Sequence, residues 1–150
     1  MKEVVAHARR LLARQLYSDG PILSRPGLVE TYLRLQLASQ ERACFAMVLL
    51  DRRKRVIACL ELFHGTIDRV SVHPREVVRE AVLRNAASVI FARNEPCGCA
   101  KPTGVDKLTC ARLVEALDLV DIPVLDYLII GKTTTSLRKK GMSQIHVGDG

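Results

Sequence analysis

The stretch that decides the fold reads Arg93-Asn94-Glu95-Pro96-Cys97-Gly98-Cys99 and continues shortly afterwards as Pro102-Thr103-Gly104-Val105-Asp106. It follows a short apolar run, from Ala87 to Ala92, that predicts a buried strand. Thr103 and Asp106 have the spacing of a capping box, with Asp where Glu or Gln is preferred, and therefore predict the start of a helix. The stretch thus combines a strand end, a loop with charged and thiol side chains, and a helix start.

The same stretch resembles the metal-binding loop of the RadC branch of the JAB/MPN (JAMM) superfamily of zinc metallopeptidases. In that branch the loop reads His-Asn-His-Pro-Ser-Gly and is followed by Pro-Ser-x-x-Asp. The resemblance covers residues 24–143 and does not rest on this loop alone. The other segments that carry it are Leu33 to Ala38, Phe45 to Asp51, Arg55 to Ala58, Phe63 to Asp68, His73 to Val78, Asn85 to Ile90 and Val120 to Tyr127.

The resemblance implies an α/β (α+β) sandwich of the cytidine-deaminase-like type, with a central mixed β-sheet flanked by helices. It divides the chain into N-terminal helices within residues 1–40 that pack on the core, a RadC-like JAB/MPN domain over residues 24–143, and a flexible tail at residues 144–150. We expect the domain to be complete without the helix-hairpin-helix region that longer relatives carry in front.

The residues that hold and activate zinc in the family are mostly replaced. The family's two histidines, its serine, its aspartate and its catalytic glutamate correspond here to Arg93, Glu95, Thr103, Asp106 and Ala43. Only the aspartate is retained. Glu41 lies two residues before Ala43, but that step displaces a carboxylate by about 6.6 Å along a strand.

Zinc catalysis needs about three ligands from His, Cys, Asp or Glu, together with a base for the bound water. Arg93 places a permanent cation where an imidazole should donate a lone pair, so it repels zinc. We therefore predict that Arg93 pairs with Glu95 or Asp106, and we expect no cofactor. The alternative is a zinc site rebuilt around the thiolates of Cys97 and Cys99, together with the carboxylates of Glu95 and Asp106, or with Cys59 or Cys110 brought close by folding. A Cys-x-Cys spacing alone is weak evidence for such a site.

Apolar periodicity and turn residues predict the remaining elements. They are a helix from Val4 to Leu16, a helix from Pro26 to about Ala38 capped by Ser24, a hairpin of Cys44–Leu50 and Val56–Phe63, a helix from Pro74 to about Asn85, a helix to about Val120, and a strand from Pro123 to Ile130.

Composition predicts one cytoplasmic domain. The chain has 150 residues, 48% hydrophobic and 26% charged, with no apolar run of the roughly 18 to 20 residues that cross a membrane. Its first residues lack the pattern of a secretion signal. The five cysteines are irregularly spaced and odd in number, which argues against a disulfide framework. We interpret Cys44, Cys59 and Cys110 as small buried hydrophobic residues.

The net charge of +7 raises the question of nucleic-acid binding. The run Arg52-Arg53-Lys54-Arg55, at the expected hairpin turn, and arginines of the first helix could contact phosphates. With three Phe, three Tyr and no Trp, there is little aromatic surface for stacking on single strands. We therefore expect at most weak, non-specific binding.

These observations predict a catalytically inactive interaction or scaffold module that binds a protein partner or forms a homodimer. One alternative is a JAMM-type metal-dependent hydrolase with a non-standard site, and another is a nucleic-acid-binding protein associated with DNA repair, the label that RadC-like proteins carry. A decaying copy without a selected function also stays open. We interpret His64, between Phe63 and Gly65, as a turn histidine and not as a replacement ligand.

Overall fold

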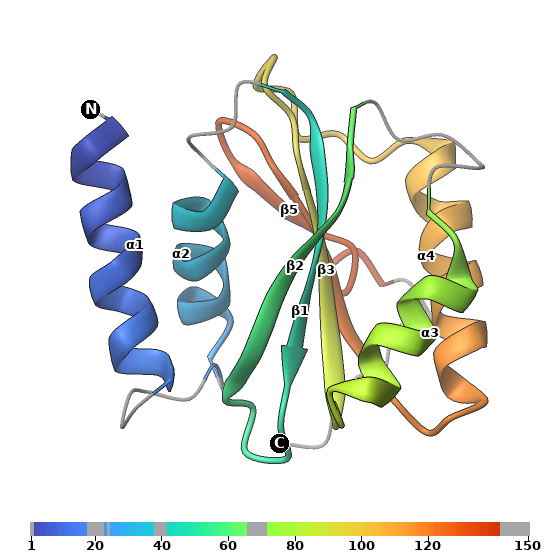
Figure 1. The fold of residues 1–150 in the computed structure, drawn as a ribbon. Helices are drawn as coiled ribbons and strands as arrows, with labels where there is room; N and C mark the ends of the chain where they lie inside the picture. Colours follow the sequence, from blue (N-terminus) through green and yellow to red (C-terminus); the bar gives the residue numbers. More distant parts are fainter. Residues whose placement is uncertain (1, 18–22, 24, 38–41, 66–71, 142–150) are drawn as a thin grey trace.

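The computed structural model describes residues 2–17, 23, 25–37, 42–65 and 72–141, and the side chains of residues 10–17 and 26 are not described. The described part contains four helices and five strands, shown in Figure 1. In chain order they are α1 (Lys2–Tyr17), α2 (Pro26–Leu37), β1 (Cys44–Leu50), β2 (Val56–His64), α3 (Pro74–Leu83), β3 (Ser88–Asn94), α4 (Gly104–Asp118), β4 (Val124–Ile130) and β5 (Thr134–Ser136).

The strands form one mixed sheet in the order β2-β1-β3-β4-β5. Strand β1 pairs antiparallel with both β2 and β3, β3 pairs parallel with β4, and β4 pairs antiparallel with β5. A parallel pair needs a crossover connection, and α4 supplies it between β3 and β4. This is the α/β sandwich with a mixed sheet that the resemblance implied.

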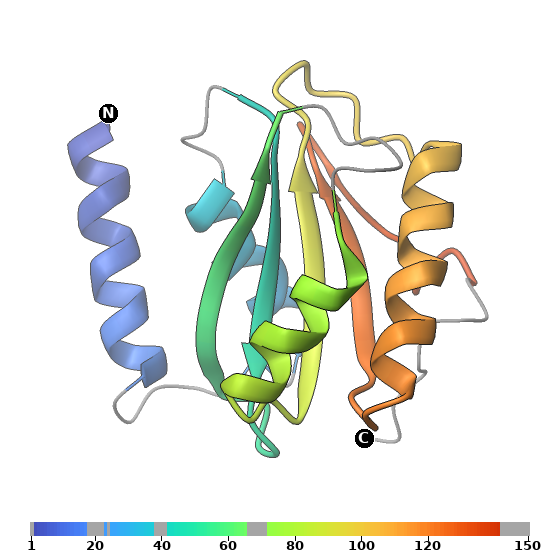
Figure 2. The ribbon, with the colours of Figure 1, turned by 45° about the vertical axis from the view of Figure 1, so that its right-hand side comes forward.

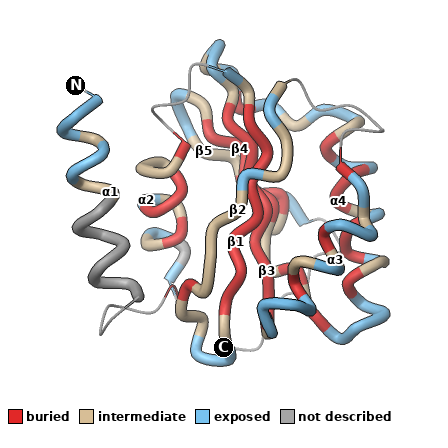
Figure 3. The backbone as a smooth tube through the Cα atoms, viewed as in Figure 1, coloured by how far each residue is buried: buried red, intermediate tan, exposed pale blue. Residues whose placement is uncertain are grey.

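Helices cover both faces of the sheet. Helix α2 lies on one face with α1 outside it, and α3 and α4 lie on the other (Figures 1 and 2). Strand alternation divides the core between these faces. Phe45 and Phe91 face α3 and α4, whereas Ala46 and Ile90 face α2. Figure 3 shows that β1 and β3 are buried along their length while β2, at the edge, is half-buried.

The sequence predicted most elements to within a few residues. Its one error at the site is the end of β3, which was expected at Ala92 and which continues through Arg93 and Asn94. The polar strand β5 was not predicted. Three expectations lie outside the described residues: the Ser24 cap, the position of Glu41 and the tail at residues 144–150.

None of the helices in the described ranges combines the length and the apolar character needed to cross a membrane.

Candidate functional site

A pocket of about 450 Å³ opens where β1 begins and β3 ends. Ala43, Arg93, Glu95 and Thr103 all line it. Asp106, from the first turn of α4, is fully buried and hydrogen-bonded to Arg93 and Thr103. The five positions that correspond to the metal and catalytic residues of the family are therefore brought to one place, as the resemblance requires.

Arg93 fills the centre of this arrangement. It is 5% exposed and follows Phe91 on the face of β3 that packs against α4. Its Nε donates a hydrogen bond to Oδ1 of Asp106 at 2.6 Å, and its Nη2 donates to Oδ2 at 2.7 Å. Its Nη1 also donates to a carboxylate oxygen of Glu95. The predicted ion pair is thus present with both carboxylates, and the bond to Asp106 is bidentate.

Asp106 is held by three further groups besides Arg93. The backbone N–H of Thr103 donates to Oδ2 of Asp106 at 2.8 Å, and the backbone N–H of Asp106 donates to Oγ1 of Thr103 at 3.2 Å. These two bonds form the predicted capping box at the start of α4. The hydroxyl of Tyr127, on β4, donates to Oδ1 at 2.8 Å. The carboxylate therefore has a structural role in this chain that does not depend on a metal.

The charges of the pair stabilise each other. Burial alone would raise the pKa of Asp106, but hydrogen bonds from Arg93, Thr103 and Tyr127 and the charge of Arg93 hold this pKa below its usual value. Burial would likewise lower the pKa of Arg93, and the carboxylates of Asp106 and Glu95 raise it instead. Burial and the nearby Asp106 raise the pKa of Tyr127, which stays protonated as a donor. The site is an internally hydrogen-bonded network in which one guanidinium is shared by two carboxylates.

The residues of this pocket do not fit a catalytic zinc ion. The guanidinium of Arg93 occupies the position of one histidine and already binds both remaining carboxylates. Ala43 offers a methyl group at the position of the catalytic glutamate. Cys97 and Cys99 are exposed thiols of the loop. A cation would therefore have to displace Arg93 from Asp106 and Glu95 before it could bind them.

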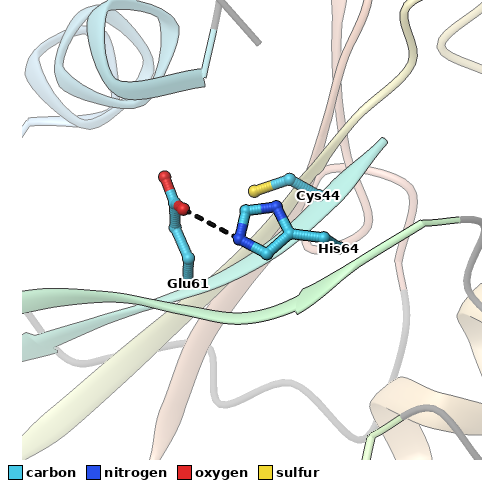
Figure 4. A group of neighbouring side chains, drawn as sticks. All are labelled: Cys44, Glu61 and His64. Carbon is cyan, nitrogen blue, oxygen red and sulfur yellow. Dashed lines mark ion pairs between the residues drawn. The ribbon is translucent and has the colours of Figure 1, made fainter. Parts of the chain in front are cut away.

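A second group of potential ligands lies on the other face of the sheet and was not predicted from the sequence, which assigned His64 to a turn, whereas His64 is the last residue of β2. Cys44, Glu61 and His64 each offer one ligand atom, and these atoms lie within 4.8 Å of one another (Figure 4). Nε2 of His64 lies 3.1 Å from Oε2 of Glu61. Cys44 is 1% exposed, whereas Glu61 and His64 are exposed.

A β-bulge brings these three side chains together. Cys44 pairs with His64 and Phe45 with Phe63, but Ala46 pairs with Glu61, so Leu62 is an extra residue of β2. In a regular strand Glu61 and His64 would point to opposite faces. The bulge lets both Leu62 and Phe63 pack towards α3 and α4, and leaves Glu61 and His64 on the face of Cys44.

The thiols of this face are poor nucleophiles. Burial, followed by the charge of Glu61, raises the pKa of Cys44 to about 12. Burial likewise raises the pKa of Cys59 to about 11, although a hydrogen bond from Tyr32 works against the shift. On the opposite face of the sheet, burial also raises the pKa of Cys110, in α4, to about 12. Cys44 and Cys110 are buried as predicted, whereas Cys59 is only half-buried.

The basic run at the β1–β2 turn does not form one surface. Arg52 and Arg53 are exposed and line a depression with Val82 and Val120. Lys54 lines a different pocket together with Arg25 and Arg138. Arg55 is half-buried, and its backbone N–H donates to Asp51.

Four exposed apolar side chains lie at the same end of the molecule as Arg52 and Arg53, and we call them the apolar end patch. Val82 and Leu83 end α3, and Leu119 and Val120 follow α4. Leu83 is 68% exposed and Leu119 is 85% exposed.

The sequence comparisons agree with this geometry. A sequence profile described as RadC-like JAB domain matches residues 23–142. The chain is 44% identical over 139 residues to a UPF0758 protein of Vibrio cholerae, and the match covers 93% of this chain and 88% of that protein. It is 49% identical over 132 residues to a UPF0758 protein of Cellvibrio japonicus, covering 85% and 59%. It is 45% identical over 143 residues to a protein of the same description from Nitrosospira multiformis, covering 95% and 63%. The chain therefore spans about three-fifths of the length of the last two relatives.

Proposed function

Because the chain belongs to the RadC-like JAB domain family, we propose that it is a binding module of that family that has lost zinc-dependent hydrolysis. The observation that carries this proposal is the buried guanidinium of Arg93, which binds both oxygens of Asp106 and also Glu95. A positive charge with no lone pair, at a position that the family uses for a zinc ligand, supports the loss of that chemistry.

The alternative of a hydrolase with a non-standard site has less support. It would need Glu95, Cys97, Cys99 and Asp106 to converge on one cation. Glu95 and Asp106 are already hydrogen-bonded to Arg93. Among the described residues that line the pocket, the position of the family's catalytic glutamate holds Ala43, which has no titratable side chain to act as a base.

The activity assay that tests this proposal compares two proteins loaded with Zn²⁺. The wild type should show no chelator-sensitive hydrolysis of a panel of peptide and isopeptide substrates. A variant with Ala43→Glu, Arg93→His and Glu95→His restores the family pattern and should gain Zn²⁺ at the loop. Chelator-sensitive hydrolysis by the wild type would overturn the proposal.

We propose that the bound partner is a protein with an apolar surface bordered by acidic side chains, and that it docks on the apolar end patch. Leu83 and Leu119 offer exposed apolar area there, and Arg52 and Arg53 line the adjoining depression. Asp51, at the same depression, accepts hydrogen bonds from the backbone of Arg53 and Arg55. The overall charge of +7 also disfavours association between two copies of the chain.

Site-specific photocrosslinking in cells tests the docking surface. A photoreactive residue at position 119 should give a discrete protein adduct, whereas one at position 108, where Leu108 is 42% exposed on α4, should not. Leu83→Asp should reduce the adduct, and Leu119→Asp should weaken binding of the identified protein reconstituted in vitro. An adduct with a second copy would replace the proposal with a homodimer. Failure to form a discrete adduct at position 119 would reject this surface.

Two further expectations belong with this proposal. We propose a cytoplasmic location, because five cysteines at irregular spacing suit a reducing compartment. The DNA-repair alternative rests on the basic turn, whose Arg52 and Lys54 line separate pockets. Weak phosphate binding by such a turn would fall steeply with salt concentration, whereas docking of a partner held mainly by apolar contacts would fall less steeply.

A further inference from the structure

We propose that Cys44, Glu61 and His64 form a binding site for a zinc-class divalent cation on the face of the sheet that packs against α2, at the rim of the pocket that Cys44 also lines. The set combines a sulfur, an imidazole nitrogen and a carboxylate oxygen within 4.8 Å of one another. These are the three donor types that bind Zn²⁺ in proteins, and three of them leave a fourth position for water. This site is independent of the positions that correspond to the family's metal ligands and does not rest on the proposed function.

The distances suit a cation after a small closure. Bond lengths of about 2.3 Å to sulfur and about 2.0–2.2 Å to nitrogen or oxygen put tetrahedral ligands roughly 3.5 Å apart. Nε2 of His64 and Oε2 of Glu61 are already 3.1 Å apart. The remaining closure of about 1 Å needs only side-chain rotation, since the side chain of Glu61 is 34% exposed and that of His64 is 55% exposed.

The backbone around the site is fixed by several contacts. Cys44 and His64 face each other across β1 and β2. The backbone N–H of Cys44 donates to Oδ1 of Asn94 at 2.6 Å, and the amide of Asn94 donates to the carbonyl of Arg42 at 3.0 Å. The N–H of Gly65 donates to the carbonyl of Ala43 at 2.7 Å. Rigid supports of this kind position one buried ligand, around which the two exposed ligands can adjust.

The bulge is the second observation that favours a site. An extra residue at Leu62 disrupts the pairing of an edge strand, and its consequence is to turn Glu61 and His64 to the same face. Without it, Cys44 would face His64 alone. A cation bound here would join the start of β1 to the end of β2, next to Ala43 and Phe45, which line the pocket. A cation bound here would therefore bridge β1 and β2 at the rim of that pocket and keep one coordination position for water.

Cobalt titration of the reduced, metal-free chain tests the assignment. Co²⁺ should bind one ion per chain with the near-ultraviolet charge-transfer absorption of a cobalt–thiolate bond, and Zn²⁺ should displace it. Removing a residue that only hydrogen-bonds to a metal ligand typically weakens metal affinity by about 10–100-fold. Because His64→Gln and Glu61→Gln remove ligands themselves, each variant should bind Co²⁺ at least tenfold more weakly. Cys44→Ala should abolish the absorption.

Matched controls keep the test decisive. His73 is another exposed histidine, and Cys97 and Cys99 are exposed thiols. His73→Gln and the double variant Cys97→Ser/Cys99→Ser should bind Co²⁺ as the wild type does. If Cys44→Ala does not fold, the exposed variants His64→Gln and Glu61→Gln still decide. Absence of saturable binding would overturn the proposal, as would binding that is lost in the Cys97→Ser/Cys99→Ser variant and kept in His64→Gln.

Discussion

Potential metal ligands lie on both faces of the sheet, but their surroundings differ. On the face of α4, the carboxylates of Glu95 and Asp106 are both paired with Arg93, which is 5% exposed. On the face of α2, the ligand atoms of Cys44, Glu61 and His64 lie within 4.8 Å of one another, and Nε2 of His64 lies 3.1 Å from Oε2 of Glu61. The first group is closed to a cation by its own salt bridge, whereas the second keeps its donors close together on a partly exposed surface.

Asn94 belongs to both regions, because it also lines the pocket with Arg93 and Glu95. Asn94 follows Arg93 at the end of β3 and therefore points to the other face, where it accepts a hydrogen bond from the N–H of Cys44. The comparison teaches that one strand end can position two different groups of side chains on its two faces. The same strand end now positions a buried ion pair on one face and a thiol on the other.

Among the variants that test this difference between the faces, Arg93→Ala should cause the largest loss of folding stability. It leaves Asp106, which is fully buried, without its charge partner, and breaking a buried pair in this way typically costs about 3–5 kcal/mol. Arg79→Ala is the matched control, because the Arg79–Glu76 pair is exposed and should contribute only about 0.2–1 kcal/mol. Urea unfolding of both variants measures the difference. Equal, small losses would mean that Arg93 does not hold the site together.

A second effect appears at acid pH. The pKa of Asp106 is lowered from 3.8 because the hydrogen bonds from Arg93, Thr103 and Tyr127 outweigh burial. A lowered folded-state pKa contributes stability that is fully present above the unfolded pKa and is lost as the pH falls through the folded pKa. Asp106→Asn should therefore lower stability at neutral pH and flatten the acid limb of a plot of unfolding free energy against pH.

Asp126 is the control for this pH dependence. Burial raises its pKa despite hydrogen bonds from Ser136, Arg138 and Tyr127. A raised carboxyl pKa in the folded state increases stability as the pH falls through it, so Asp126→Asn should make the acid loss steeper. Parallel slopes for the two variants would contradict the assignment of opposite shifts.

A smaller effect separates the structural role of Thr103 from the family's catalytic serine. Thr103 caps α4 through the N–H of Asp106, and replacing a capping Thr by Ala typically costs about 0.5–2 kcal/mol. Thr103→Ser keeps the capping oxygen and should retain most of that stability. Thermal unfolding of the two variants distinguishes them. A loss in Thr103→Ser as large as that in Thr103→Ala would argue against the capping role.

The difference between the two faces also explains what the sequence could predict. Arg93, Glu95 and Asp106 lie in one contiguous stretch, so their resemblance to a known loop and their opposite charges were enough to predict the salt bridge that forms. Tyr127 was not predicted as a partner of Asp106, because the parallel pairing of β3 and β4 brings it there from a distant segment.

The ligands on the other face could not be predicted by the same reasoning. The spacing of Glu61 and His64 suits a helix face, and in a regular strand it separates the two side chains. Only the extra residue at Leu62 reverses this, and bulges have no strong sequence signature in an apolar strand. A signal was nevertheless present: a charged residue and a histidine within a run of otherwise apolar strand residues that ends at Gly65.

His64→Gln is expected to change the stability of the metal-free chain least. Its response to Zn²⁺ nevertheless decides whether the two faces of the sheet differ in cation binding. Exposed ion pairs such as His64 with Glu61 contribute about 1 kcal/mol or less, so the variant should unfold almost as the wild type does in a chelator. With Zn²⁺ at a hundred times its dissociation constant, the wild type should gain about 2.7 kcal/mol and the variant should not, because a ligand that binds only the folded state stabilises it by mass action. His73→Gln should gain as much as the wild type.

Urea unfolding with chelator and with Zn²⁺ measures each difference. Equal stabilisation of His64→Gln and the wild type would mean that the face of α2 is as closed to cations as the face of α4.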